Sequence, residues 1–295
     1  RRYADVLERA LYNGVLSGES LGGDAFFYTN RLAVYPAMEA FTPGGVGARR
    51  SPWFGCACCP PNLARLIASL GGYIYSQAED ELWVHLYMGS SVKLQLAGQE
   101  VSLRQETNYP WDGQVHLRLW LHKPARFTLA LRIPGWCRKA KLSVNGEKVK
   151  VKAVTRNGYA RIERKWQDGD RIELVLPMPV ERMEAHPRVR HDCGRVALQR
   201  GPLVYCLEEP DNGPDLNDIA LPSGSELTAT FDPDLLGGVM VVGAEALRRD
   251  EDGFGGTLYR PLGSQYRAVN LKAIPYYAWA NRELGEMLVW MNALV

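Results

Sequence analysis

Residues 59–87 read CPPNLARLIASLGGYIYSQAEDELWVHLY, and the spacing of their apolar residues changes along this stretch. From Leu63 to Leu70 the apolar residues recur at helical spacing, after two prolines and before a pair of glycines, which predicts a helix between those limits. From Leu82 to Leu86 every second residue is apolar, as in a strand with one buried face. The chain therefore changes from helical to β structure near Gly72.

The residues before this stretch are predicted to be helix and loop. Apolar spacing from Val6 to Val15 predicts a first helix over residues 1–18. An aromatic run at residues 26–30 predicts a short strand, and the Gly-, Pro- and Arg-rich residues 42–55 predict a loop that leads into the cysteines. Two helices of this length cannot bury a core by themselves, so we expect them to belong to a helical barrel.

The residues after this stretch carry repeated strand patterns, separated by turn residues such as Asn145-Gly146. Strands of this kind predict antiparallel sheets packed as sandwiches. We expect strands at residues 82–86, 92–96, 115–121, 127–133, 172–176, 196–207, 239–247 and 274–279. Prolines break the pattern at residues 177–190, and polar turn residues predict a loop at 210–225.

These patterns predict an α+β chain of several domains. Residues 1–75 are the helical part, which we expect to be the end of a barrel. Residues 76–180 are expected to form a first β-sandwich, completed by residues 265–295, and residues 181–264 a second one.

The composition excludes two classes of partner. The 295 residues carry a formal net charge of +2 with basic and acidic residues intermixed, so there is no electrostatic case for nucleic acid. No apolar run approaches the roughly 18 residues that cross a bilayer, so we expect no membrane partner. The start at Arg1, without a Met, predicts a fragment of a longer protein whose targeting signals would lie upstream.

Three of the six cysteines, Cys56, Cys58 and Cys59, fall within four positions just before the second predicted helix. The partial positive charge of a helix N-terminus favours a thiolate at such a place. Spacing alone leaves three interpretations open: buried thiols with or without a strained disulfide, zinc ligands, or a redox site. Adjacent reduced cysteines favour a cytoplasmic location, although the true N-terminus is not visible.

The other polar candidates show no catalytic or ligand pattern. The remaining cysteines, Cys137, Cys193 and Cys206, are expected to be ordinary buried thiols. The five histidines have no metal-ligand spacing. Four acidic residues near the cysteine loop are expected to be surface or helix-end charges: Glu8, Glu19, Asp24 and Glu39.

The run WFGCACCPPNLAR, residues 53–65, resembles the signature of glycoside hydrolase family 127, the β-L-arabinofuranosidases. Residues 3–14, 131–137, 199–205 and 274–282 also resemble family segments, in family order, so that the resemblance covers nearly the whole chain. It implies an (α/α)6 barrel, which residues 1–75 would end, followed by β-sandwich domains.

The resemblance also implies a catalytic site. Cys58 matches the family's nucleophile, and Cys58 and Cys59 match two of its ligands for zinc (Zn²⁺), whereas Cys56 does not match a described ligand. A Glu-x-Cys motif and an acid/base glutamate lie upstream in the family, and this sequence contains no Glu-x-Cys, so we expect the chain alone to be inactive. The rings of Tyr28 and Trp53 are candidates to line the sugar site.

The implied function is that of a retaining, non-reducing-end β-L-arabinofuranosidase acting on an arabinofuranoside-type oligosaccharide, and family members often pair as homodimers through their C-terminal sandwiches. In this mechanism a thiolate attacks the anomeric carbon and water later hydrolyses the thioglycosyl intermediate. Two alternatives stay open: a non-catalytic carbohydrate-binding or packing module, and a structural zinc or redox thiol protein. A covalent sugar adduct on Cys58 would distinguish the glycosidase hypothesis from both alternatives.

Overall fold

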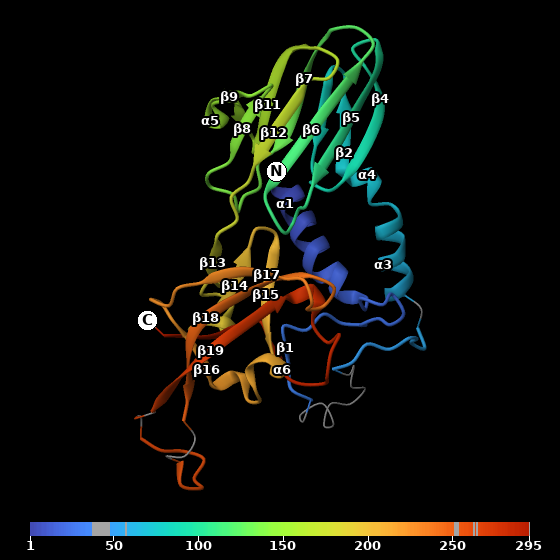
Figure 1. Cartoon of the computed structure of the whole chain (residues 1–295). Helices are drawn as coiled ribbons and strands as arrows, with labels where there is room; N and C mark the ends of the chain where they lie inside the picture. The colour runs from blue at the N-terminus through green and yellow to red at the C-terminus, as the bar shows by residue number, and fades with distance from the viewer. Residues whose placement is uncertain (37–47, 57, 251–253, 262, 264, 295) are drawn as a thin grey trace. The chain divides into compact units, whose positions relative to one another are not determined.

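The computed structural model describes residues 1–36, 48–56, 58–250, 254–261, 263 and 265–294, and these residues are mostly β structure with a few short helices (Figure 1). They form two compact units. The first consists of Arg1–Ala10 and Asn62–Pro179, and the second of Leu11–Pro61 and Val180–Val295. Glu39 and the first part of the loop predicted at residues 42–55 lie outside the described residues. No helix in the described ranges is long and apolar enough to cross a membrane.

The first unit contains two sheets. The strands of the five-stranded sheet are, in order, β10 (Thr155–Arg156), β11 (Tyr159–Trp166), β7 (Ala125–Arg132), β3 (Glu81–Val84) and β2 (Tyr75–Ala78). The strands of the six-stranded sheet are β4 (Ser90–Leu96), β5 (Gln99–Thr107), β6 (Gln114–Leu121), β12 (Arg171–Val175), β8 (Lys141–Val144) and β9 (Glu147–Val149). Figure 1 shows β4, β5 and β6 side by side in the latter sheet. Two single-turn helices, α4 (Gly71–Ile74) and α5 (Val151–Val154), flank the strands.

The strands of this unit follow the predicted alternation. On β6, Val115, Leu117 and Leu119 are buried, whereas His116 and Arg118 between them are exposed, because successive side chains point to opposite faces of a sheet. The strands expected here are confirmed, with small shifts at their ends. One pairing differs from the antiparallel expectation. Strands β3 and β7 run parallel, because the chain passes through the other sheet between them.

A buried ion pair attaches the first helix, α1 (Arg2–Arg9), to the end of β7. The guanidinium of Arg132, fully buried, donates to the carboxylate of Glu8, which also accepts from the hydroxyl of Tyr109 at 2.6 Å and the indole N–H of Trp136 at 3.1 Å. Burial is the largest single influence on the pKa of Arg132 and would lower it, but the charge and hydrogen bond of Glu8, together with Tyr109 and Tyr87, outweigh burial and hold that pKa above its ordinary value. Glu8 was expected to be a surface or helix-end charge. It does lie at the end of α1, but it is not on the surface, since only 1% of it is exposed.

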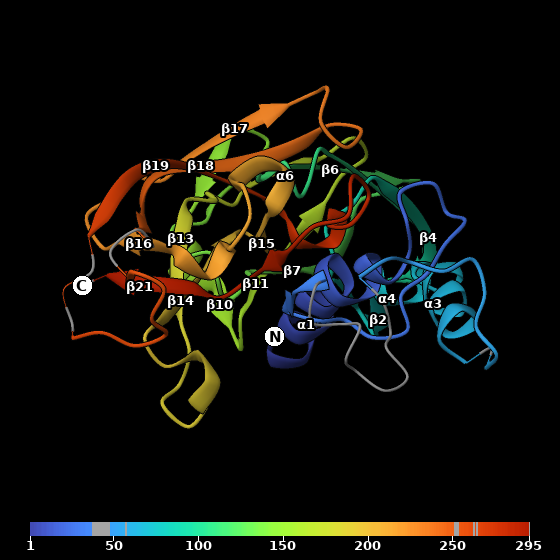
Figure 2. The same ribbon diagram turned by 90° about the horizontal axis from the view of Figure 1, so that it is seen from below.

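The second unit contains a ten-stranded sheet, part of which Figure 2 shows from below. Its main path runs β1 (Ala33–Val34), β20 (Met287–Leu288), β15 (Leu203–Glu208), β19 (Tyr266–Pro275), β18 (Val239–Arg249), β16 (Ile219–Pro222), β21 (Met291–Leu294), β14 (Arg195–Arg200) and β13 (Val180–Glu184). Strand β17 (Thr228–Asp232) pairs with β18, and β14 also pairs with β15, so the path returns on itself. Short helical turns join the strands: η3 (Arg190–Asp192), α6 (Glu209–Asn212), η4 (Leu216–Asp218) and η6 (Tyr276–Ala278).

The expected completion of residues 76–180 by residues 265–295 is wrong. Strand β19 pairs with β18 from Val242↔Ala273 to Arg249↔Tyr266, and with β15, so it belongs to the second unit. Its apolar residues Leu271, Ala273 and Ile274 are buried there. Alternation along a strand predicts which of its faces is buried, but it does not predict which strand pairs with it. The sequence carries no other pattern that indicates the strand beside β19.

The predicted helical domain at residues 1–75 is divided between the two units. The first helix itself is confirmed as α1 followed by the π-helical turn η1 (Ala10–Val15) and the 3₁₀ turn η2 (Leu16–Gly18). Glu8 attaches its start to the first unit, whereas the side chain of Asn13 donates to the carbonyl of Pro202 at 2.9 Å and accepts from the N–H of Val204 at 2.7 Å in the second. Each part therefore packs on its own sheet.

Four local predictions also differ from the structure. The aromatic run at 26–30 contains only isolated bridges at Phe26, and the nearby strand is β1. Strand β13 lies in the proline-interrupted stretch 177–190, and β16 lies in the predicted loop 210–225. The strand expected at 274–279 ends at Pro275 and continues as the turn η6. Each is a short element whose form depends on its neighbours more than on its own pattern.

Replacing Arg132 with Met should lower the free energy of unfolding by about 3–5 kcal/mol, because the buried carboxylate of Glu8 loses its partner. Urea unfolding measures this loss. The matched control is Arg126→Met, since Arg126 is exposed and pairs with Glu163 at 3.0 Å, and such a pair contributes about 1 kcal/mol or less. Small and equal losses in both variants would contradict the structural role given to Arg132.

Candidate functional site

Two thiols and a phenol meet at the N-terminal end of α3 (Cys59–Ala68). The Sγ atom of Cys58 lies 3.5 Å from the Sγ atom of Cys59 and 3.2 Å from the hydroxyl oxygen of Tyr28. Cys58 is exposed, and both cysteines are free thiols rather than a disulfide. The structure thus brings together three of the four residues predicted for the site.

An isolated β-bridge between Phe26 and Ser51 holds the segment that contains Tyr28 near the thiols. The backbone N–H of Phe26 donates to the carbonyl of Ser51 at 2.9 Å, and the N–H of Ser51 donates back to Phe26 at 2.9 Å. The chain on either side of the bridge stays close, and the ring of Tyr28 lies 5.4 Å from the ring of Phe54. Because only a short segment separates Ser51 from Cys58, this pairing sets where the Tyr28 hydroxyl lies.

Arg50 holds this bridge against the C-terminal part of the second unit. Its guanidinium donates to the carbonyls of Ser17 at 2.9 Å, Trp279 at 2.8 Å and Ala280 at 3.1 Å. It also lies 4.4 Å above the ring of Phe27, which stacks on Trp279 at 4.5 Å. Burial lowers the pKa of Arg50 to about 10, so it stays charged at neutral pH. No pattern in the sequence singles out Arg50.

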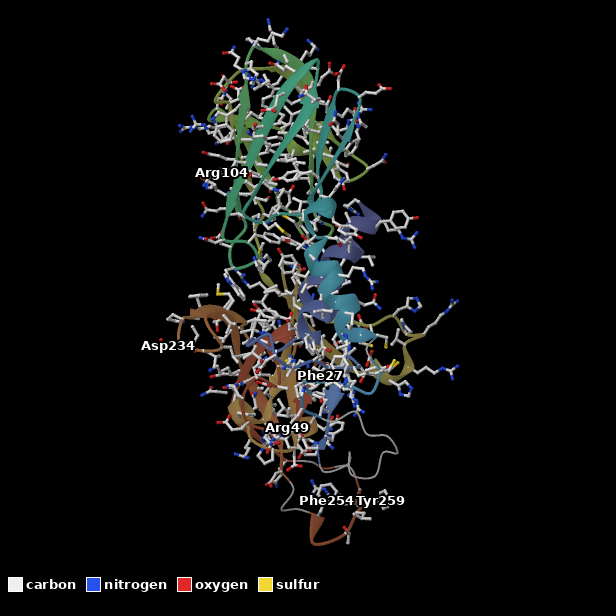
Figure 3. All side chains as sticks on the ribbon, turned by 90° about the vertical axis from the view of Figure 1, so that its right-hand side faces the viewer. Phe27, Arg49, Arg104, Asp234, Phe254 and Tyr259 are labelled. Atoms are coloured by element: carbon white, nitrogen blue, oxygen red, sulfur yellow. The ribbon has the colours of Figure 1, made fainter. Side chains whose placement is uncertain are left out.

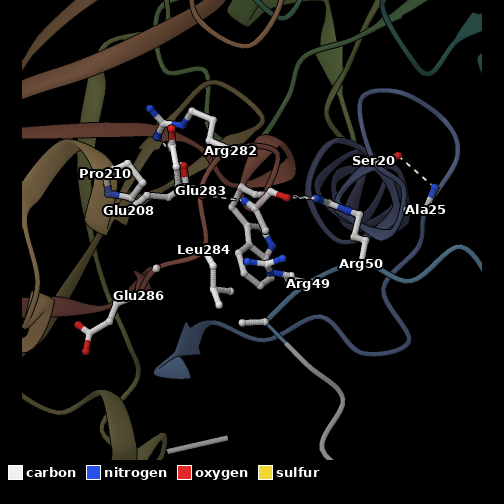
Figure 4. Close-up of a pocket in the computed structure, with 14 residues that line it drawn as sticks. Ser20, Ala25, Arg49, Arg50, Glu208, Pro210, Arg282, Glu283, Leu284 and Glu286 are labelled. Carbon is white, nitrogen blue, oxygen red and sulfur yellow. Dashed lines mark hydrogen bonds and ion pairs between the residues drawn. The ribbon is translucent and has the colours of Figure 1, made fainter. Parts of the chain in front are cut away.

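A cavity of about 300 Å³ lies beside Arg50 (Figure 4). Its wall includes Arg282, which donates to Glu208 at 2.6 Å, and the neighbouring Glu283 and Glu286. The described residues that line it include none of the predicted site residues. The thiols therefore lie on an open surface rather than in this cavity.

The three groups of the site influence one another's protonation. The Tyr28 hydroxyl, and then Cys59 and Cys56, form hydrogen bonds that lower the pKa of Cys58, since they stabilise its thiolate. The pKa of Cys59 and the pKa of Tyr28 are raised by the same contacts with Cys58. Cys58 is thus the thiol that loses its proton first, and Tyr28 remains the donor.

The two sulfurs suit two positions of a zinc site. Thiolates bound at about 2.3 Å to one tetrahedral zinc ion lie roughly 3.8 Å apart, close to the 3.5 Å between Cys58 and Cys59. Among the residues that the structure describes, no group of three or more His, Cys, Asp or Glu side chains could hold a metal ion.

Comparison with known families shows to which protein family the chain belongs. Residues 1–72 match the GH127 catalytic domain of β-L-arabinofuranosidases, residues 81–178 the GH127 middle domain, and residues 180–292 the C-terminal domain of glycoside hydrolase family 127. The chain belongs to glycoside hydrolase family 127. The resemblance read from residues 53–65 is thereby confirmed.

Individual relatives agree. The chain is 40% identical to the non-reducing end β-L-arabinofuranosidase of Bifidobacterium longum subsp. longum, over 98% of this chain and 45% of that protein. It is 55% identical to a crystal structure of a GH127 β-L-arabinofuranosidase from Geobacillus stearothermophilus T6, with a TM-score of 0.96 over 99% of this chain and 46% of that one. A further GH127 β-arabinofuranosidase structure is 38% identical with a TM-score of 0.88, over 99% of this chain and 45% of that one. The chain spans about half the length of these family members.

The remaining predicted residues have mixed outcomes. The ring of Trp53 is 67% exposed, and its place in a sugar site stays a prediction. Cys137 and Cys206 are buried thiols as expected, and burial raises the pKa of both. The expectation for Cys193 is wrong, because it lies exposed after the turn η3. Sequence reasoning missed Phe54, although it adjoins Trp53 in the signature run.

Replacing Tyr28 with Phe should move the pH midpoint of Cys58 alkylation upward. The hydroxyl lowers the pKa of Cys58, so its removal raises that pKa, and the thiolate appears at higher pH than in the unmodified chain. Iodoacetamide labelling in the presence of a chelator, with peptide mass mapping of Cys58, measures the midpoint. Tyr73→Phe, at an exposed tyrosine, is the control. An unchanged or lower midpoint in Tyr28→Phe would contradict the role of the hydroxyl.

Proposed function

We propose that this chain supplies the nucleophile of a retaining glycosidase that acts on β-L-arabinofuranosides, and that Cys58 is that nucleophile. The observation that carries the proposal is the contact of 3.2 Å between the Tyr28 hydroxyl and an exposed Cys58 thiol at the start of α3. An exposed thiol with a lowered pKa is the kind that reacts as a nucleophile. The family relatives are named β-L-arabinofuranosidases, which supports a β-L-arabinofuranoside as the substrate.

The chemistry follows from the positions of Cys58 and Tyr28. The Cys58 thiolate attacks the anomeric carbon, a C–S bond forms, and the bond to the leaving oxygen breaks while a carboxylic acid protonates that oxygen. The Tyr28 hydroxyl, by donating to the sulfur, keeps it deprotonated and aimed before the attack. Water then displaces the sulfur from the other side, so two inversions give net retention of configuration.

Zinc is part of this proposal. Cys58 and Cys59 would hold it, and the other ligands would come from residues other than those described here. When bound, zinc would favour the thiolate forms of both cysteines and fix their orientation. The proposal that Cys59 is a ligand and not the nucleophile rests on its raised pKa and smaller exposure.

We further infer that the helices of residues 1–75 belong to an (α/α)6 barrel and that the sheets after them form β-sandwiches. Helix α3 supports the first part, because none of its residues is buried although Leu63, Leu66 and Ile67 make an apolar stripe. On α1 the side chains of Tyr3 and Val6 are 86% and 65% exposed. Apolar helix faces of this kind are normally covered by other helices.

The alternatives make different predictions. A non-catalytic module needs neither a reactive thiol nor Tyr28 beside it, and a structural zinc site does not need an exposed sulfur with a lowered pKa. The cytoplasmic location and the homodimer stay predictions.

Replacing Cys58 with Ser, in the protein that contains this chain, should lower turnover of p-nitrophenyl β-L-arabinofuranoside by roughly four orders of magnitude or more. Elemental analysis of the same proteins should show zinc in the unmodified form and a loss of zinc in Cys59→Ser. The matched control is Cys193→Ser, which removes an exposed cysteine elsewhere. Near-normal turnover in Cys58→Ser would contradict the assignment of Cys58 as the nucleophile. Unchanged zinc content in Cys59→Ser would contradict the assignment of Cys59 as a zinc ligand.

A further inference from the structure

We propose that the outer face of the six-stranded sheet in the first unit binds an acidic oligosaccharide, one that carries uronate carboxylates. The site is a row of three arginines, Arg104 on β5, Arg118 on β6 and Arg171 on β12, beside the half-buried ring of Trp120. They line one hollow of about 340 Å³. All four residues lie outside the thiol site described above.

The three arginines stand directly opposite one another. Arg104 is the register partner of Arg118, and Arg118 is the register partner of Arg171, so their side chains leave the same face of three adjacent strands. Two strand spacings make the row about 10 Å long. All three are exposed, and Arg104 lies on the outer side of the sheet in Figure 3.

Such a row works against folding. Like charges directly opposite each other on neighbouring strands repel, and here the central arginine has one on each side. Two contacts offset part of the repulsion: the Nε of Arg104 pairs with Glu106 at 3.0 Å, and the guanidinium of Arg118 lies 5.2 Å from the ring centre of Trp120. Both are surface contacts of small value. A bound anion would relieve the repulsion among the three arginines, and the row would then act as a binding site.

The neighbouring row decides the kind of anion. Glu106 and Glu173 both face His116 in register, on the same side of the sheet as the arginines, and all three line the hollow. Two carboxylates repel a densely charged polymer such as a nucleic acid, but they accept hydrogen bonds from hydroxyl groups. A sugar chain with well-separated carboxylates can pair with the arginines through those carboxylates and donate its hydroxyl groups to the glutamates.

Each group then has a matching part of the ligand. Guanidinium groups bind carboxylates with two parallel hydrogen bonds, which suits the uronate groups. The apolar side of a sugar ring can lie on the exposed part of Trp120, and the glutamates can accept from ring hydroxyls. This recognition goes beyond the glycosidase function proposed for the thiols, and it does not depend on that function.

Calorimetric titration of the full chain with a galacturonate trisaccharide tests the proposal. We expect saturable binding at low salt, and Arg118→Thr should weaken it at least tenfold, because the central guanidinium is lost. The matched control is Arg126→Thr, on the other sheet, where Arg126 pairs with Glu163 at the same 3.0 Å as Arg104 with Glu106. Its affinity should equal that of the unmodified chain.

Two further readouts separate recognition from a merely structural role. The methyl-esterified trisaccharide, which has no carboxylates, should bind far more weakly than the acid, and Arg118→Thr should melt no lower than the unmodified chain, because a repulsion is relieved. If Arg118→Thr does not fold, Arg171→Thr replaces it. No binding at millimolar trisaccharide, equal binding of the methyl ester, undiminished affinity in the folded arginine variant, or tighter binding of a DNA duplex would each overturn the proposal.

Discussion

The guanidinium of Arg50 is the contact on which the site depends. It donates to carbonyls of Ser17, Trp279 and Ala280 and lies over the ring of Phe27, so it joins the first helical turns, the segment before the cysteines and the end of the C-terminal sheet. The bridge next to it then sets the place of Tyr28. A half-buried cation with several carbonyl acceptors is costly to disturb, because each acceptor would lose a charge-assisted hydrogen bond. The residues that follow η6 in the second unit are thus part of the framework around Tyr28 and Cys58, although they contribute no reactive group.

Local environment distinguishes Cys58 from the other five cysteines of the chain. Burial raises the pKa of Cys137, between β7 and β8, and the pKa of Cys206, on β15, so the thiolate is disfavoured at both. Cys193 is exposed, but its thiol donates to the carbonyls of Pro187 and Val189, and carbonyls do not stabilise a thiolate. Only beside Tyr28, at the start of α3, does an exposed sulfur meet a phenol donor in the described part of the chain. The same partnership explains why Cys59, one residue later, has its pKa shifted the opposite way.

The sequence predicted the elements whose information is local. The alternation on β6 and the proline-started helix after Cys58 follow from side-chain direction and capping, which the order of residues encodes directly. The partner of β19 and the burial of Glu8 could not be read in this way, because both depend on residues far away in the chain: Pro275 on β19 pairs with Tyr205 on β15, and Glu8 pairs with Arg132. For the site, the signature run pointed to Cys58 and Cys59, and Tyr28 was expected only as a ring beside the sugar, not as a partner of the thiol. Arg50 acts through backbone carbonyls that any residue could offer.

The most direct test of the central claim is to find where the sugar becomes attached. A 2,4-dinitrophenyl β-L-arabinofuranoside has a leaving group that departs without help from an acid, so the attack by sulfur can be observed by itself. The protein that contains this chain is mixed with the substrate, quenched in acid and mapped by peptide mass spectrometry. The account predicts one pentosyl group on Cys58, absent from Cys58→Ser. A pentosyl group on Cys59 or Cys56 instead, or turnover of the substrate without any adduct, would contradict it.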